Sequence, residues 1–323
     1  MILAVDIGGT KVAAGLVDDS GNFVRTHRVP MHARGSAAEA MECVHQAIAP
    51  LLSEANGVSA IGISSPGPLD PEGGLVLDAP NLPCWKNFPL LAEVSKRYHL
   101  PSKLDNDANA AGLAEALWGA GKGFRYVLYI TMGTGIGTAI VLDRKIYYGR
   151  TGAAAEGGHM TIDYRGEAIC GCGKPGCIES LAAGPALARR AHNLIAENPN
   201  STASFLKFAN GDDQAITAEV VIRAAQAGDP LALRLIKVTV MYLGVWIGNM
   251  IDLIEPDVIV GGGGMGAALK PWLDDVKQAS LRWTINRRAD QIPLVAAHYG
   301  ADAGLAGSAA LWLQADAARP AAK

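Results

Sequence analysis

The segment from Glu156 to Glu179 constrains the fold of this chain more than any other. Its potential metal ligands are His159, Cys170, Cys172 and Cys177. One histidine and three cysteines joined by short glycine-rich turns match the ligand set of a closed tetrahedral Cys₃His zinc site. Such a zinc site could position side chains that face a substrate, or it could only stabilise a loop. The remaining alternative is that the three cysteines are unrelated thiols that bind no metal.

Composition narrows the class of protein. A chain of 323 residues predicts one large domain or two medium ones, and 38 glycines with 50% hydrophobic residues are typical of a globular, turn-rich α/β protein. The net charge of −3 gives no electrostatic reason to expect nucleic acid or an anionic membrane as partner.

Five cysteines, an odd number with three close together, suit metal binding in a reducing cytoplasm better than a disulfide framework. The first residues, Met1 to Asp6, lack the basic region of a signal peptide, so we expect a cytoplasmic protein. The longest apolar run, 238–251, is shorter than the ~20 residues of a membrane span and predicts a buried core helix.

The order of elements predicts an α/β fold with an internal duplication. Three strands (2–7, 10–17 and 23–29), a helix (36–51) and a strand (58–64) form a meander followed by a crossover, unlike the βαβαβ opening of a dinucleotide-binding fold. The second half repeats the strand–glycine turn–strand unit of the first, with a strand at 126–131, a glycine turn and a strand at 138–142. Later elements are expected at 88–98 (helix), 102–104 (strand), 108–118, 184–197, 203–208, 217–227 and 230–254 (helices), 258–260 (strand), 265–281 (helix), 292–297 (strand) and 301–314 (helix), with a frayed tail at 315–323. The glycine-rich joint 119–123 is the expected domain boundary.

The first glycine turn follows Asp6. A P-loop is excluded, because Gly8-Gly9-Thr10-Lys11 lacks its spacing and a strand follows it. We interpret the segment as a tight hairpin in which both glycines take a positive φ. Its amides could bind phosphate, Asp6 could hold Mg²⁺ through water, and Thr10 and Lys11 could reach phosphate. The alternative is an ordinary hairpin.

Two further glycine runs lie at strand ends. Gly133-Thr134-Gly135-Ile136-Gly137 is followed by a strand, so it is not a dinucleotide fingerprint, but it could act as a second phosphate-binding hairpin. The run 261–264 lies between a strand and a helix, where a ring or phosphate can approach closely.

Asp107 precedes or begins a predicted helix. It is either a helix cap or a general base that accepts a proton from an attacking hydroxyl. Phosphoryl transfer needs little beyond an oriented nucleophile, Mg²⁺ and donors for the phosphate charge.

Together these motifs resemble the ROK family of bacterial sugar kinases and repressors. The motifs that carry the resemblance are Asp6-Ile-Gly-Gly-Thr-Lys11, Asn106-Asp107-Ala-Asn109-Ala-Ala, Gly133 to Gly137, Glu156-Gly-Gly-His159 and Cys170 to Glu179, and they span nearly the whole chain. The resemblance implies the two-lobed actin/hexokinase-like (ribonuclease H-like) ATPase fold with duplicated βββαβα units. It also implies a small lobe of residues 1–120, completed by the C-terminal helix 301–323, and a large lobe of residues 121–300 that carries the zinc site.

The resemblance further implies an ATP-dependent kinase, most similar to glucokinases, that phosphorylates the 6-hydroxyl of a hexose with Asp107 as general base. It assigns sugar binding to Gly67, Asn81, Asn106, Asp107, Glu156, His159 and Glu179. It assigns ATP and Mg²⁺ to Asp6, Gly8, Gly9, Thr10, Lys11, Gly133, Thr134, Gly135, Gly137, Gly262 and Gly263. One structural Zn²⁺ per chain would be held by His159, Cys170, Cys172 and Cys177, with the second ring nitrogen of His159 offered to the sugar.

Two positions depart from the family pattern. Thr138-Ala139 stands where many members have Gly-Gly, and Gly157 replaces an Ile or Leu, which we expect to loosen the sugar loop. Repressor members carry a helix-turn-helix domain before the first hairpin, which here begins at residue 2, so we expect a kinase. An N-acetylmannosamine or N-acetylglucosamine kinase, and a non-catalytic sugar-sensing protein, are the alternatives. The preferred hexose, polyphosphate as donor, and the choice of homodimer or homotetramer stay open.

Overall fold

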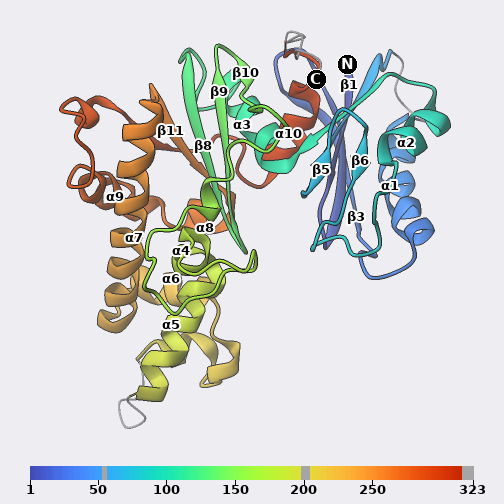
Figure 1. Ribbon diagram of the computed structural model, residues 1–323. Helices are drawn as coiled ribbons and strands as arrows, with labels where there is room; N and C mark the ends of the chain where they lie inside the picture. The colour runs from blue at the N-terminus through green and yellow to red at the C-terminus, as the bar shows by residue number, and fades with distance from the viewer. Residues whose placement is uncertain (53–56, 198–203, 315–323) are drawn as a thin grey trace. The chain divides into compact units, whose positions relative to one another are not determined.

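The computed structural model describes residues 1–52, 57–197 and 204–314 (Figure 1). By internal packing the chain forms two compact units. Unit 1 comprises Met1–Tyr129, Ala139–Ala154 and Ala301–Lys323, and unit 2 comprises Ile130–Thr138 and Ala155–Gly300. The division into lobes at residues 120 and 300 stays a prediction, and its segment 315–323, like the expected frayed tail, lies outside the described residues.

The first sheet has the strand order β3-β2-β1-β4-β7. Its strands are β1 (Ile2–Ile7), β2 (Lys11–Val17), β3 (Phe23–Pro30), β4 (Ala60–Ser65) and β7 (Ser102–Asn106). β1 pairs antiparallel with β2 and parallel with β4, so the predicted meander followed by a crossover is confirmed. Two short strands, β5 (Leu69–Asp70) and β6 (Leu75–Val76), form a separate hairpin.

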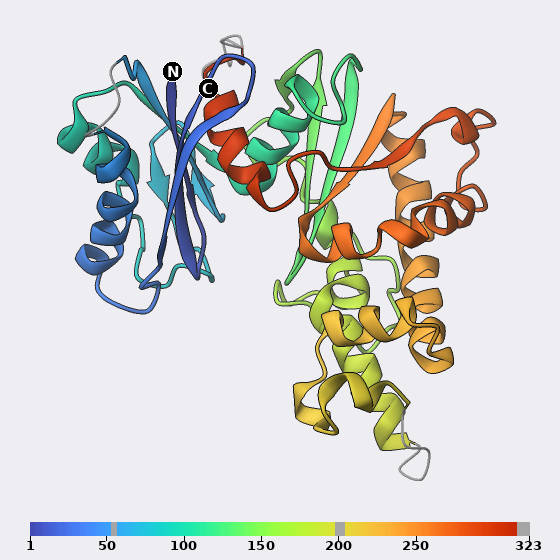
Figure 2. The same ribbon diagram turned by 180° about the vertical axis from the view of Figure 1, so that it is seen from behind.

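Helices cover both faces of this sheet (Figures 1 and 2). On one face lie α1 (Ala37–Leu52) and α2 (Leu90–Tyr98), and on the other α3 (Asp107–Leu117) and α10 (Ala303–Ala310). α1 begins with a capping box, in which Ser36 and Glu39 bond each other's backbone N–H groups. Close packing of α10 depends on small residues, because a Cβ at Gly307 would lie 2.1 Å from the carbonyl carbon of Ala110 in α3.

The second sheet repeats the order as β10-β9-β8-β11-β12. Its strands are β8 (Tyr126–Met132), β9 (Ile136–Leu142), β10 (Lys145–Ile146), β11 (Val258–Gly262) and β12 (Leu294–Ala296). Across each sheet, the three strands of an antiparallel meander lie side by side in reverse chain order, and two strands reached by crossover connections follow next to the first strand of the meander. The duplication predicted from the sequence is therefore confirmed.

The remaining helices belong mostly to unit 2. They are η1 (Gly157–His159), α4 (Ile178–Ala182), α5 (Gly184–Glu197), η2 (Ser204–Ala209), η3 (Asp213–Ala215), α6 (Ala218–Gln226), α7 (Pro230–Ile254), α8 (Gly263–Ala268), η4 (Lys270–Trp272), α9 (Leu273–Ser280), η5 (Ala289–Gln291) and η6 (Gly300–Asp302). The single helix predicted for 265–281 is wrong, because Pro271 interrupts the hydrogen-bond ladder between α8 and α9. The helix predicted for 203–208 is a 3₁₀ helix from Ser204, and residue 203 lies outside the described residues.

α7 is the longest helix among the described residues. Asp229 caps it by accepting from the backbone N–H groups of Leu231 and Ala232. Its 25 residues match the helix predicted for 230–254, and by length and composition alone it could cross a membrane. Of its most apolar window, 56% is buried within the fold, which is the property of the core helix that the sequence predicted.

Candidate active site and zinc centre

The first glycine turn joins β1 to β2 and is closed by a 2.9 Å hydrogen bond from the Gly8 N–H to the Lys11 carbonyl. Neither Gly8 nor Gly9 has a positive φ, so the conformation predicted for both is wrong. Gly9 is required for another reason: a Cβ there would lie 2.7 Å from the backbone oxygen of Asn81. The structure thus brings Asn81, a predicted sugar ligand, against the turn, while Thr10 and Lys11 are exposed.

Asp6 is the penultimate residue of β1 and lies within a hydroxyl network. The Ser64 hydroxyl donates to Asp6 Oδ1 at 2.7 Å, and Ser308 Oγ lies 2.9 Å from Ser64 Oγ. Burial raises the pKa of Asp6, against the opposing effects of the Ser64 hydrogen bond and the Lys11 charge. Burial disfavours the charged carboxylate, and a cation beside it would offset this effect. The oxygen donors at Asp6 therefore fit a site for Mg²⁺.

Gly304 of α10 packs directly against this carboxylate, because a Cβ at Gly304 would lie 2.6 Å from Asp6 Oδ1. Replacing Gly304 by alanine should therefore displace Asp6 and lower kcat/KM for Mg-ATP at least about tenfold. Steady-state kinetics at varied Mg-ATP, with the melting temperature as a control for folding, measures the effect. An unchanged kcat/KM would show that the Asp6 position is irrelevant to the nucleotide.

Asp107 is the first residue of α3, and the preceding residue is the cap. Asn106 Oδ1 accepts from the backbone N–H groups of Ala108 at 2.9 Å and Asn109 at 3.4 Å. The helix therefore does not need Asp107 as its N-cap, although Asp107 Oδ1 also accepts from Ala108 N at 2.8 Å. Burial, followed by the negative charge of Asp6, raises the pKa of Asp107 to about 6. A carboxylate that titrates near neutral pH is suited to act as a general base.

Asp105 is a neighbour that the sequence reasoning passed over. The residue is 2% exposed, and its carboxylate accepts from the Asn106 N–H at 2.7 Å, from Asn109 Nδ2 at 3.1 Å and from the Tyr148 hydroxyl. These bonds hold the start of α3. Gly67 lies nearby, because a Cβ there would be 3.4 Å from Asn106 Nδ2, so two more predicted sugar ligands meet in unit 1.

The second glycine turn lies between β8 and β9 in unit 2. A cavity of about 280 Å³ beside it is lined by Gly133, Thr134 and the first residues of α5 and α6, among them Pro185 and Glu219. The lining residues of α5 and α6 were not predicted, because no spacing in the sequence links them to the turn.

The third glycine run lies beside the second turn. Gly262 ends β11, and Gly263 begins α8 with a φ of +79°. A Cβ at Gly263 would lie 2.4 Å from the Met132 carbonyl oxygen, at the end of β8. Only glycine satisfies both conditions, and two of the three predicted glycine turns therefore meet in unit 2.

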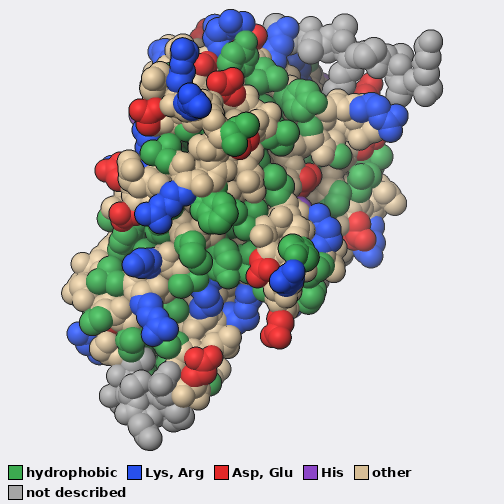
Figure 3. Space-filling view, turned by 60° about the vertical axis from the view of Figure 1, so that its left-hand side comes forward, with side chains coloured by type: hydrophobic (Ala, Val, Ile, Leu, Met, Phe, Trp, Pro, Cys, Tyr) green, Lys and Arg blue, Asp and Glu red, His purple; other side chains and the backbone are tan. Residues whose placement is uncertain are grey.

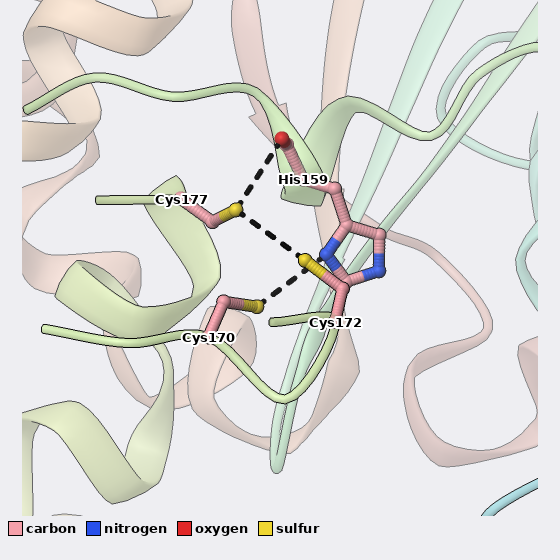
Figure 4. A group of neighbouring side chains, drawn as sticks. All are labelled: His159, Cys170, Cys172 and Cys177. Carbon is pink, nitrogen blue, oxygen red and sulfur yellow. Dashed lines mark hydrogen bonds between the residues drawn. The ribbon is translucent and has the colours of Figure 1, made fainter. Parts of the chain in front are cut away.

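The four predicted zinc ligands converge, with all ligand atoms within 4.8 Å of one another (Figure 4). The distance from Cys172 Sγ to Cys177 Sγ is 3.7 Å, and that from Cys170 Sγ to His159 Nδ1 is 3.5 Å. A tetrahedral zinc ion, with bonds of about 2.3 Å to sulfur and about 2.05 Å to nitrogen, separates two sulfurs by about 3.8 Å and a sulfur and a nitrogen by about 3.5 Å. The donor set and its spacing fit zinc.

The surroundings of the cluster agree with a metal centre. Burial raises the pKa of the Cys170 thiol to about 12, so a cation is needed to hold it as a thiolate. Figure 4 shows His159 with Nδ1 toward the sulfurs and its other ring nitrogen turned away from them. That second nitrogen is available to another partner.

Glu179 links the cluster to the second glycine turn. Its Oε1 lies 3.4 Å from Cys170 Sγ, and its Oε2 accepts from the Ile136 N–H at 2.9 Å. A Cβ at Gly135 would lie 2.4 Å from the same Oε2. Glu156, by contrast, is exposed at the start of η1 and forms no side-chain cap.

The predicted residues thus gather in two groups. Unit 1 holds Asp6, Gly8, Gly9, Thr10, Lys11, Gly67, Asn81, Asn106 and Asp107, and unit 2 holds Gly133, Thr134, Gly135, Gly137, Glu156, His159, Glu179, Gly262, Gly263 and the three cysteine ligands.

The duplicated sheets and this site define a sugar-kinase-like protein of the actin/hexokinase-like fold. The sequence profile of the ROK family matches residues 2–315, and the chain belongs to that family. It is 34% identical over 320 residues to the glucokinase of Streptomyces coelicolor, covering 98% of each chain. It is 32% identical to the N-acetylmannosamine kinase of Yersinia pseudotuberculosis, covering 97% of this chain and 98% of that one. Among solved structures, it resembles a ROK family glucokinase from Streptomyces griseus in complex with glucose and AMPPNP, with a TM-score of 0.83, 36% identity and coverage of 96% and 98%.

Proposed function

We propose that this protein is an ATP-dependent hexose kinase that phosphorylates the 6-hydroxyl, with glucose as its preferred sugar. The observation that carries the proposal is Asp107, a carboxylate whose pKa is raised to about 6 by burial and by Asp6, at the capped start of α3. The similarity to glucokinases over the full length of the chain supports the choice of glucose.

In the proposed mechanism, the Asp107 carboxylate accepts the proton of the sugar 6-hydroxyl while the oxygen of that hydroxyl bonds to the terminal phosphorus of ATP. The bond from this phosphorus to the bridging oxygen breaks, and ADP leaves. Asp6, fixed by Ser64 and Gly304, would hold Mg²⁺, which supplies charge neutralisation at the phosphates when bound. The turn from Gly8 to Lys11 would lie against the phosphates, where Lys11 would add a positive charge, while the Gly8 N–H stays bonded to the Lys11 carbonyl.

The sugar-binding residues of the proposal come from both groups. In unit 1 they are Gly67, Asn81, Asn106 and Asp107, and in unit 2 they are Glu156, His159 and Glu179. The nucleotide would be bound by Asp6 to Lys11, Gly133, Thr134, Gly135, Gly137, Gly262 and Gly263. His159 and the three cysteines would hold the zinc, which would fix the orientation of the His159 ring so that the nitrogen remote from the metal can meet the sugar.

The second candidate is an N-acetylmannosamine or N-acetylglucosamine kinase, which the Yersinia pseudotuberculosis relative favours. A sugar-sensing protein without turnover is the third. A coupled assay with Mg-ATP or polyphosphate and four sugars (glucose, mannose, N-acetylmannosamine and N-acetylglucosamine) tests them. The proposal requires the highest kcat/KM with glucose and ATP, whereas sugar binding without turnover would establish the sensor.

The raised pKa of Asp107 predicts the pH dependence of catalysis. Only the ionised carboxyl accepts a proton, so kcat/KM should fall about tenfold per unit below pH 6 and reach a plateau above it. A profile between about pH 4.5 and 8 measures this. A rate that is flat through pH 6 would exclude Asp107, at this pKa, as the base.

Two coarser features complete the proposal. We propose a cytoplasmic protein, in keeping with five cysteines that form no disulfide.

We also propose a homodimer or homotetramer. Large hydrophobic side chains are exposed on unit 2, including Met241, Leu253, Trp283 and Ile285, and hydrophobic side chains are visible between charged ones on the face drawn in Figure 3. Light scattering would decide the number of subunits.

A further inference from the structure

Thr138 of β9 makes two backbone contacts on either side of Glu156. Its side chain is buried, with the residue 4% exposed. Its hydroxyl accepts from the Gly157 N–H at 2.9 Å and donates to the Ala155 carbonyl. One hydroxyl can make both bonds at once, since it carries one donor and two acceptor positions. The peptide groups before and after Glu156 are therefore tied to the same atom.

Other contacts fix the same turn. Ala155 has a φ of +63°, a strained value for a residue with a side chain. The buried indole of Trp246 donates to the Gly157 carbonyl at 3.0 Å. A Cβ at Gly158 would lie 1.8 Å from the Ile136 oxygen, so the turn lies directly on β9. The backbone of the turn is held from three sides, while the Glu156 carboxylate stays exposed.

The shapes of Thr138 and Gly157 also match. A Cβ at Gly157 would lie 2.8 Å from Thr138 Oγ1 and 3.1 Å from its Cγ2. The threonine side chain thus fills the space that a larger residue at 157 would need. The expectation that Gly157 loosens the loop is wrong, because both its N–H and its carbonyl are bonded.

We propose that Thr138 is a positioning residue for sugar recognition: its hydroxyl fixes the backbone on both sides of Glu156, and so the point from which the Glu156 side chain reaches a sugar hydroxyl. The inference rests on the proposed function, in which Glu156 binds the hexose. A ligand-binding side chain on a fixed backbone discriminates between sugars by geometry, and a turn released from β9 accepts more of them.

The first test compares Thr138→Val with Thr138→Ser. Valine has the same shape but leaves the Ala155 carbonyl and the Gly157 N–H without a partner, whereas serine retains the hydroxyl. With valine, the KM for glucose should rise about tenfold and the preference for glucose over N-acetylmannosamine should narrow, while the KM for ATP stays within about twofold. With serine, the glucose KM should return to within about threefold of the wild type.

Thr239 of α7 supplies a matched control, since it is another buried threonine whose hydroxyl makes two bonds: it donates to the Leu235 carbonyl at 3.1 Å and accepts from the Arg190 guanidinium. Thr239→Val should lower the melting temperature without changing the glucose KM. A Thr138→Val enzyme with the wild-type glucose KM would overturn the inference. So would equal increases in the glucose and ATP KM values, which would indicate general damage to β9.

A second test remains informative if Thr138→Val fails to fold. Gly157→Ala should displace the Thr138 hydroxyl and raise the glucose KM. Adding Thr138→Ala should raise the glucose KM little further, because the hydroxyl contact is already lost. Fully additive losses would contradict the pairing of the two residues. A wild-type protein that phosphorylates no hexose would overturn the proposed function and this inference together. An active wild type with an unchanged Thr138→Val would overturn this inference alone.

Discussion

Replacing Asp107 by asparagine should lower kcat by about 100- to 10,000-fold while glucose affinity stays within about tenfold of the wild type. A general base contributes to the chemical step far more than to binding, and asparagine keeps the size and most of the hydrogen-bonding capacity of the side chain. Single-turnover kinetics together with calorimetric binding of glucose would separate the two effects.

Stability provides the control for this variant. Because the pKa of Asp107 is raised in the folded protein, its contribution to stability is full below its unfolded value, near 3.8, and is lost as the pH rises through about 6. At pH 8 the neutral asparagine should therefore be at least as stable as the wild type. Asp143→Asn, at an exposed residue paired with Arg125, should change neither rate nor binding. Equal losses of turnover and sugar affinity would instead indicate that Asp107 only supports the start of α3.

Removing the zinc centre should have the second largest effect. Cys172 is the exposed ligand, so Cys172→Ala leaves no cavity in the core and acts mainly by releasing the metal. We expect zinc content to fall from about one ion per chain to near zero and the glucose KM to rise about tenfold or more, since His159 then loses its orientation. The ATP KM should change far less.

Metal analysis and sugar titration would measure this outcome. Cys84→Ala, at a half-buried cysteine outside the cluster, is the matched control and should retain zinc and activity. Full activity without bound metal would contradict a role for the cluster in holding the sugar pocket.

Local patterns in the sequence were enough to predict the parts of the site that are close together in the chain. The four zinc ligands lie within 19 positions of one another and converge as the spacing indicated. The capped start of α3 was also predicted, although the residue considered as the cap was Asp107. The geometry assigns the cap to Asn106.

What the sequence did not predict depends on contacts between distant segments. Ser308 reaches the Val5 carbonyl across 303 positions, and Gly304 supports Asp6 from α10. The reason for a glycine at position 9 was predicted wrongly. Glycine is needed there because the Asn81 backbone approaches closely, and not because the turn requires a positive φ. Thr138 and Gly157 looked like two separate departures from the family pattern, and only their hydrogen bond relates them.

Product analysis tests the central claim most directly. Purified protein is mixed with glucose, ATP and Mg²⁺, and the phosphorylated products are identified by ³¹P and ¹³C NMR. The account predicts ADP and a glucose phosphorylated on its 6-oxygen in equal amounts, with sugar phosphate formed at least about 100-fold more slowly by the Asp107→Asn variant. A phosphoryl group on another oxygen, no transfer to any hexose, or an undiminished yield from Asp107→Asn would contradict it.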